Sequence, residues 1–225
     1  MQAEVHFISG YRLDDIVSTY PDIHISVNPN WESQGSLGSL LAAPLNPGQT
    51  TYVCYADIVI SSDSVRLLSQ ADGDVNLLAD RSWRHRYEGR SDTDLASAEK
   101  LCIADNLVVE IGSDIPVEKA DGEFVGLVKL SPAAVDHLLE IAESKRQTLG
   151  SFGIPRLIQE FQDAGFKVRP IEIEGGWAEL NAPQDLARFA LGTKADTLER
   201  LRPLVRHSCI GEQVTFTVDQ WQTDG

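Results

Sequence analysis

Basic side chains are scarce in this sequence of 225 residues, which has 19 Lys and Arg against 34 Asp and Glu and a formal net charge of −15. Binding along a nucleic-acid backbone depends on clustered Lys and Arg that replace the counterions of the phosphates. The shortage of these residues therefore argues against a nucleic-acid partner. An acidic protein can still bind nucleotides where a metal ion and a few cations are placed locally.

Cysteines and long hydrophobic runs are also few. The three cysteines, Cys54, Cys102 and Cys209, stand far apart without metal-ligand spacing, which is typical of reduced thiols. No stretch approaches the roughly 18 apolar residues of a membrane span, and the first residues lack the basic and apolar regions of a signal peptide. These absences predict a cytoplasmic protein with no membrane partner.

Strand-like and helix-like segments alternate along most of the chain. We expect strands over residues 4–9, 23–27, 51–56, 123–130 and 166–174, and helices over residues 13–20, 133–143 and 154–164. This alternation predicts an α/β fold with a mostly parallel twisted sheet flanked by helices. Residues 76–115 are more polar and predict a hairpin around Asp105 and Asn106.

Asp57 follows an apolar strand directly, and in parallel sheets the ligand lies beyond the carboxyl ends of the strands. Taken alone, Asp57 could equally be a helix cap or a solvated strand end. A second acidic site follows near residue 180, where Glu179 and Asn181 alternate onto one side of an extended segment. Together these oxygens could hold one Mg²⁺ and leave coordination positions for phosphate oxygens. Such a site suits phosphoryl or nucleotidyl transfer.

Short motifs occur in a characteristic order over about residues 4–190. They are Ile8-Ser9-Gly10-Tyr11, Asn28-Pro29, Ser36-Leu37-Gly38-Ser39-Leu40, Tyr55-Ala56-Asp57-Ile58-Val59, Trp83, Tyr87-Glu88-Gly89-Arg90, Ala98-Glu99-Lys100, Asp121-Gly122-Glu123-Phe124-Val125-Gly126-Leu127 with Lys129, and Gly176-Trp177-Ala178-Glu179-Leu180. This series resembles the sugar-phosphate and phosphocholine-type nucleotidyltransferase family. Residues 87–100 and 122–129 resemble its phosphonate and phosphocholine cytidylyltransferase branch. The resemblance implies a Rossmann-like, nucleotide-diphospho-sugar transferase-like fold.

Within these motifs we expect two catalytic residues, Asp57 and Lys129, and three ligands for Mg²⁺, namely Asp57, Glu179 and Asn181. The expected substrate-binding residues are Ser36, Ser39, Arg90, Glu123, Gly126 and Trp177. Most of them have a simpler explanation as well. Lys129 and Arg90 could be solvated surface charges, Glu123 could cap or pair locally, and the two serines could cap a helix.

Two departures from the family pattern bear on activity. The family begins with a strand and a phosphate-binding loop of the form Leu-Ala-Ala-Gly-x-Gly-x-Arg, whereas Met1 stands just before what resembles the second strand. We therefore expect the first βα unit to be missing. The family's last motif reads Glu-Ile-Asp, but this chain has Glu179-Leu180-Asn181. Because an amide carries no charge, metal binding there should be weaker.

We expect two regions, a nucleotidyltransferase domain over residues 1–190, incomplete at its N-terminus, and a tail or linker over residues 191–225. The tail resembles the lead-in to a phosphoenolpyruvate-synthase-like or ATP-grasp kinase domain, which implies a fused or partner kinase domain.

The expected activity is transfer of a nucleotidyl group, with CTP as the favoured nucleotide, to a phosphorylated or phosphonate small molecule with release of pyrophosphate. Two alternatives remain. One is a Mg²⁺ phosphohydrolase that uses the same carboxylates, and the other is a catalytically weakened nucleotide- or substrate-binding remnant that partners a kinase domain.

Overall fold

The structure is a computed structural model that describes residues 4–88 and 90–181 together with residues 185, 198, 202, 206 and 211. The chain divides into two compact units, Met1–Gly176 and Trp177–Gly225. The predicted boundary at residues 190 and 191 lies outside the described residues, as does all of the predicted kinase-like tail except residues 198, 202, 206 and 211.

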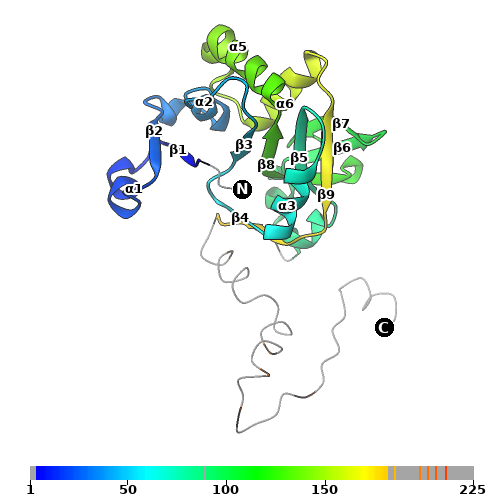
Figure 1. Cartoon of the computed structure of the whole chain (residues 1–225). Coiled ribbons are helices and arrows are strands. Elements are labelled where there is room, and N and C mark those ends of the chain that lie inside the picture. Colours follow the sequence, from blue (N-terminus) through cyan, green and yellow to red (C-terminus); the bar gives the residue numbers. More distant parts are fainter. Residues whose placement is uncertain are drawn as a thin grey trace. The chain divides into compact units, whose positions relative to one another are not determined.

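A central sheet organises the first unit (Figure 1). Its strands are β3 (Thr51–Cys54), β5 (Val75–Asp80), β6 (Lys100–Ala104), β7 (Leu107–Gly112), β8 (Gly122–Leu130) and β9 (Val168–Ile173). Five of them follow the order β7-β6-β8-β5-β9, and β3 pairs with the second half of β8. Strand β8 therefore has neighbours on both sides, which explains why it is buried along nearly its whole length.

The directions of the strands correct one expectation. The α/β class is confirmed, but the central sheet is mixed rather than mostly parallel. Only β5 and β9 pair in parallel, whereas β8 runs antiparallel to β3, β5 and β6. Strands β6 and β7 form a hairpin, as predicted, because Asp105 and Asn106 adopt the positive φ angles of 51° and 60° that a tight turn requires. A hairpin connection forces its two strands to be antiparallel.

A second, smaller pair of strands precedes the central sheet. Strand β1 (His6–Ser9), helix α1 (Leu13–Thr19) and β2 (His24–Val27) form a parallel βαβ unit whose register places His6 opposite His24. Helix α2 (Ser36–Leu40) follows after the 3₁₀ turn η1 (Trp31–Ser33). The Asn28 side chain donates to the Ser39 hydroxyl at 3.3 Å and links the end of β2 to α2.

The main hydrophobic core lies between the sheet and helices α2, α5 (Pro132–Leu149) and α6 (Ile154–Asp163). Alternate residues of β5, namely Val75, Leu77 and Ala79, enter this core because successive side chains of a strand point to opposite faces. Helix α3 (Ser62–Gln70) contacts β5 and β9 instead (Figure 1). It begins after Ser61, whose hydroxyl accepts a hydrogen bond from the Ser64 amide at 3.2 Å.

Short elements complete the described part of the chain. They are β4 (Ile58–Ile60), η2 (Trp83–Tyr87), α4 (Asp92–Ser97) and η3 (Val117–Lys119) in the first unit and β10 (Trp177–Glu179) in the second. Within the described residues, no helix combines the length and the apolar character that crossing a bilayer requires.

The stability of the first unit should fall in acid through Glu160. This side chain is only 5% exposed and accepts hydrogen bonds from Lys145 and Arg156. The Lys145 hydrogen bond, with the two cations, holds the pKa of Glu160 below its usual value despite burial. A lowered pKa in the folded state contributes stability above the unfolded pKa, and that contribution is lost as pH falls through the folded pKa.

We therefore expect the free energy of unfolding to decrease below about pH 4.5, and Lys145→Met to be about 1–2 kcal/mol less stable at neutral pH. Urea titrations of both proteins at several pH values measure this. A parallel loss of stability in both proteins below pH 4.5 would show that another group carries the acid sensitivity.

Candidate functional site

Three strands of the central sheet share one direction, and Asp57 follows the first of them in the chain. Strands β3 and β5 both run antiparallel to β8, and β9 runs parallel to β5, so all three point the same way. Asp57 lies three residues after the end of β3, in an exposed turn before β4. Burial raises the pKa of the Cys54 thiol, and the Asp57 carboxylate raises it further. Asp57 thus lies beyond the carboxyl end of its strand, which is where ligands bind in parallel α/β sheets.

Two of the predicted substrate-binding residues, Ser36 and Gly126, come together around Tyr55. The Tyr55 hydroxyl donates to the Glu99 carboxylate, with oxygen separations of 2.9 and 3.2 Å. Burial raises the pKa of Tyr55 well above its usual value, Glu99 raises it further, and a hydrogen bond from Ser36 opposes part of the rise. Gly126 lies beneath the Tyr55 ring. Sequence reasoning missed Tyr55 and Glu99 as site residues, although both lie inside motifs that carry the resemblance.

The two predicted serines have further bonds that hold them in place. Ser36 accepts a hydrogen bond from the backbone amide of Ile154 at 3.2 Å, so it joins the start of α2 to the start of α6. Ser39 accepts the bond from Asn28. Neither serine is the residue before α2, because that position is Gly35. The alternative that these serines merely cap the helix is therefore not supported by the geometry.

Glu123 lies in a separate, buried network on β8. Its side chain is only 3% exposed and accepts hydrogen bonds from Arg86 at 2.7 Å and from the Tyr87 hydroxyl at 2.6 Å. The Arg90 guanidinium lies 5.9 Å from the centre of the Tyr87 ring, within cation–π range. Arg90 and Glu123 are therefore brought together by Tyr87. Local pairing, one of the two explanations considered for Glu123, is what the structure shows.

Lys100 lies next to this network. It is fully buried and donates to the backbone carbonyls of Ala96 and Ala98 at 2.7 and 2.9 Å. Burial lowers the pKa of Lys100, and the nearby Glu123 and Asp114 carboxylates oppose that shift. Within the motif Ala98-Glu99-Lys100, the Glu99 side chain therefore contacts Tyr55, and the Lys100 side chain contacts the end of α4.

Lys129 has a structural partner that the sequence did not indicate. Its ammonium donates to the backbone carbonyls of Ser69 and Ala71 at 2.9 and 2.7 Å, where α3 ends. A cation at this position satisfies the last carbonyls of a helix and interacts favourably with its dipole. These bonds explain why a lysine is placed here. They lend no support to phosphate contact, so the catalytic role of Lys129 stays a prediction.

Trp177, Glu179 and Asn181 belong to the second unit. Trp177 is buried, Glu179 is half-buried and Asn181 is exposed. Asp57 belongs to the first unit, so the Mg²⁺ site that it would share with Glu179 stays a prediction. In the described part of the chain, no group of three or more His, Cys, Asp or Glu side chains is arranged to hold a metal ion.

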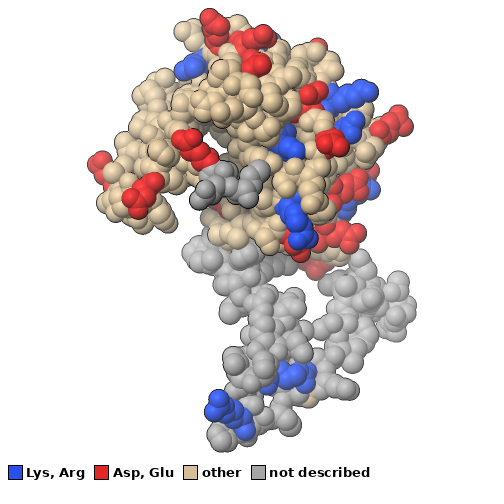
Figure 2. Space-filling view, in the orientation of Figure 1, with Lys and Arg blue, Asp and Glu red and all other residues tan. Residues whose placement is uncertain are grey.

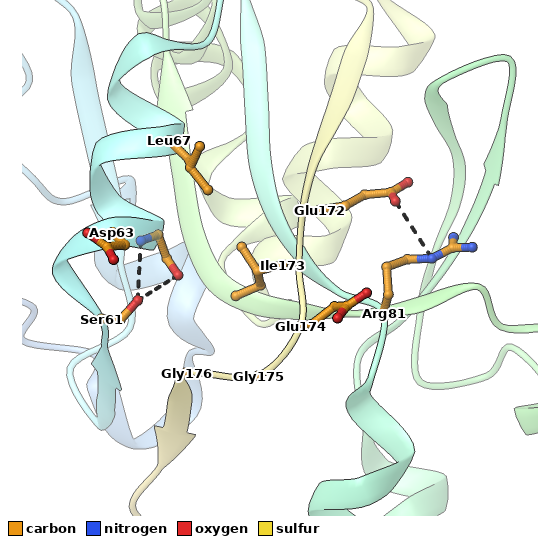
Figure 3. Close-up of a pocket in the computed structure, with 10 residues that line it drawn as sticks. Ser61, Asp63, Leu67, Arg81, Glu172, Ile173, Glu174, Gly175 and Gly176 are labelled. Atoms are coloured by element: carbon orange, nitrogen blue, oxygen red, sulfur yellow. Dashed lines mark hydrogen bonds and ion pairs between the residues drawn. The ribbon is translucent and has the colours of Figure 1, made fainter.

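A pocket of about 470 Å³ opens beside the ends of β5 and β9 (Figure 3). It is lined by Ser61, Asp63, Ser64, Leu67, Arg81, Glu172, Ile173, Glu174, Gly175 and Gly176. Three carboxylates and one guanidinium give it an acidic lining, and the guanidinium lies 3.8 Å from the Glu172 carboxylate. Like charges repel, so this lining disfavours a triphosphate. None of the predicted site residues lines the pocket.

Buried Asp80 shapes the turn at the rim of this pocket. Its carboxylate accepts hydrogen bonds from the amides of Ser82 at 2.9 Å and Gly175 at 3.0 Å. Gly175 and Gly176 have φ angles of 68° and 75°, which glycine adopts without the steric cost of a side chain. Asp80 therefore fixes the chain just before the Trp177 motif. No sequence pattern indicates this role, because Asp80 and Gly175 are 95 residues apart.

No family model matches the chain. A CTP:phosphoglutamine cytidylyltransferase of Campylobacter jejuni is 23% identical over 206 residues, which cover 81% of this chain and 79% of that protein. The inositol-1-phosphate CTP transferase of T. maritima superimposes with a TM-score of 0.62 at 17% identity, covering 80% of this chain and 71% of that one. The fold is that of the nucleotidyltransferases.

A further solved structure agrees with this result. A putative glucose-1-phosphate thymidylyltransferase from Bacillus anthracis has a TM-score of 0.61 at 17% identity and covers 84% of this chain and 76% of its own. The resemblance to nucleotidyltransferases predicted from the sequence motifs is confirmed, as is the nucleotide-diphospho-sugar transferase-like fold.

Proposed function

We propose that this chain transfers a cytidylyl group from CTP to a phosphorylated or phosphonate small molecule and releases pyrophosphate. The observation that carries the proposal is the position of Asp57 beyond the carboxyl end of β3, a strand with the same direction as β5 and β9, in a chain with the nucleotidyltransferase fold. CTP is supported by the names of two similar proteins, the cytidylyltransferase of Campylobacter jejuni and the CTP transferase of T. maritima.

The proposed reaction is a single in-line displacement. An oxygen of the acceptor's phosphate or phosphonate attacks the α-phosphorus of CTP, and the bond from that phosphorus to the bridging oxygen of the β-phosphate breaks. Pyrophosphate leaves with the bonding electrons. The attacking oxygen is already ionised at neutral pH, so no general base is needed. Positioning and neutralisation of charge supply the catalysis.

Carboxylate and amide oxygens at Asp57, Glu179 and Asn181 fit the ligand chemistry of Mg²⁺. This ion is bound in such enzymes through one or two carboxylates and the substrate phosphates, so a cluster of three acidic side chains is not required. When bound, Mg²⁺ would neutralise phosphate charge and align the α-phosphate. Asp57 is exposed and has room for such contacts.

An acceptor's phosphate needs cations to bind it. On the face drawn in Figure 2, blue Lys and Arg side chains lie between red ones instead of forming one broad basic patch. Arg90, half-buried against Tyr87, is a cation held at a defined place. We therefore propose Arg90 as a substrate-binding residue, and Ser36, Ser39, Glu123, Gly126 and Trp177 stay predicted substrate-binding residues.

A pyrophosphate-release assay with each of the four NTPs, Mg²⁺ and a panel of phosphorylated and phosphonate acceptors tests the proposal. Release that requires both CTP and one acceptor supports it. Phosphate release without an acceptor would instead indicate a phosphohydrolase. Nucleotide binding without any release would indicate a weakened binding domain that partners a kinase domain, a candidate that Asn181 favours because an amide attracts Mg²⁺ less than a carboxylate does.

The substitution Asn181→Asp should increase the affinity of the protein for Mg²⁺. A carboxylate attracts a hard cation more strongly than an amide, so we expect a several-fold lower half-saturating Mg²⁺ concentration and faster turnover. A Mg²⁺ titration of pyrophosphate release measures both. Asn106→Asp, which adds the same charge at the exposed hairpin turn, is the matched control. If both variants titrate like the parent protein, Asn181 lies outside the metal's coordination shell.

A further inference from the structure

Tyr55 follows β3 directly, and its backbone amide still forms a hydrogen bond with β8. The β3–β8 ladder ends at the pair Cys54 and Leu127, and the Tyr55 amide then donates to the Gly126 carbonyl at 2.9 Å. The next two residues form a turn, and Asp57 is the second of them. The turn that carries Asp57 therefore starts directly after this backbone bond.

The Tyr55 side chain makes a second tie, to a different part of the fold. Its hydroxyl donates to Glu99, the residue before β6, and also interacts with Ser36 at the start of α2. Ser36 in turn accepts from the Ile154 amide at the start of α6. The backbone of Glu99 also contacts β8, because its carbonyl accepts a hydrogen bond from the Phe124 amide at 2.8 Å. The Tyr55 hydroxyl thus connects the start of β6 with the start of α2 and, through Ser36, with the start of α6.

The Tyr55 ring makes a third tie. A Cβ atom on Gly126 would lie 2.5 Å from the ring's Cδ2 atom, closer than any real contact allows, and Gly126 has a φ of 87°. The ring also meets Phe124 edge-on, with centroids 5.8 Å apart. Glycine at position 126 therefore leaves room for the ring as well as for the unusual backbone angle.

We infer that Tyr55 is a positioning residue, which holds the turn bearing Asp57 in register with Ser36 and Gly126. The inference rests on the proposed function, because that function gives Asp57 its role. Backbone bond, hydroxyl and ring act on the residue two positions before Asp57, while Asp57 itself is exposed. The Tyr55 hydroxyl is not proposed to touch the reacting atoms. It limits the movement of the Asp57 carboxylate.

The test is Tyr55→Phe, which removes the hydroxyl and keeps the ring. Tyr52→Phe removes the same group from β3, three residues before Tyr55, and is the matched control. In Tyr55→Phe we expect a fall in kcat of about tenfold and a several-fold higher half-saturating Mg²⁺ concentration, the scale of one lost charged hydrogen bond. The KM for CTP should change by less than about twofold, because uniform substrate binding is retained. Tyr52→Phe should match the parent protein in all three.

A second measurement does not depend on turnover. Amide hydrogen exchange over residues 55–60 should be about tenfold faster in Tyr55→Phe and unchanged in Tyr52→Phe. Glu99→Gln keeps a carbonyl acceptor for the Tyr55 hydroxyl, so its amides over residues 55–60 should exchange less rapidly than those of Glu99→Ala. If Tyr55→Phe does not fold, the comparison of these two variants tests the inference. Equal exchange in all variants overturns the inference. Should the parent protein lack transferase activity, the proposed function fails, and the exchange result still judges the anchoring of the turn.

Discussion

Replacing Asp57 by Asn should reduce turnover by roughly 100-fold or more, the effect that losing one charge-stabilising group has at other active sites. The change keeps the size of the side chain and removes the charge that would attract Mg²⁺. Asp57 is exposed and follows the end of β3, so the substitution removes nothing from the core. The thermal midpoint should therefore shift by little, as for most surface substitutions. Pyrophosphate release and thermal melting measure the two quantities.

Asp105→Asn is the matched control for this experiment. Asp105 lies exposed at the turn between β6 and β7 with a φ of 51°, a conformation that asparagine adopts readily. It changes the net charge of the protein by the same amount. Normal activity in Asp57→Asn would remove Asp57 from the metal site and with it the main support for the proposed mechanism.

Replacing Glu123 by Ala should cause the largest loss of stability. The substitution removes the carboxylate that accepts hydrogen bonds from the Arg86 guanidinium, whose side chain is only 15% exposed, and from the Tyr87 hydroxyl. Removing one partner of a buried ion pair costs about 3–5 kcal/mol, which corresponds to a fall of roughly 6–20 °C in the melting midpoint of a domain of this size. Thermal melting of the purified proteins measures this fall.

Glu143→Ala in α5 is the control, because Glu143 is exposed and alanine suits a helix. The same experiment decides between the two roles considered for Glu123. An unchanged midpoint together with a raised KM for the acceptor would show that Glu123 binds substrate and that the network with Arg86 and Tyr87 contributes little.

Local patterns predicted much of the fold. The helix of α6, the strand of β8 and the hairpin at Asp105 and Asn106 follow from apolar periodicity and turn residues, and the structure has all three. Strand β5 was missed. Its residues 75–80 are buried on both faces, so they show no alternation, and Asn76 and Asp80 made the segment look polar. Helix α3 and the mixed sheet direction were missed with it.

The sequence indicated Asp57 because it follows an apolar strand, and its role in the site stays a prediction. Tyr55 and Glu99 are 44 residues apart, and Arg86 and Glu123 are 37 apart. Such pairs have no period or spacing that a single sequence displays, because the fold alone brings them together. For the same reason the sequence could not show that the Lys129 ammonium reaches the end of α3.

The central claim is nucleotidyl transfer, and its most direct test follows the α-phosphorus of CTP into a product. CTP labelled at the α-phosphate is incubated with the protein, Mg²⁺ and each phosphorylated or phosphonate acceptor, and the products are separated and weighed by mass spectrometry. The account predicts a labelled compound with the mass of CMP joined through its phosphorus to the acceptor, formed in equal amount to pyrophosphate and abolished by EDTA. Label that stays in CTP, or appears only as free CMP or CDP, with every acceptor would contradict it.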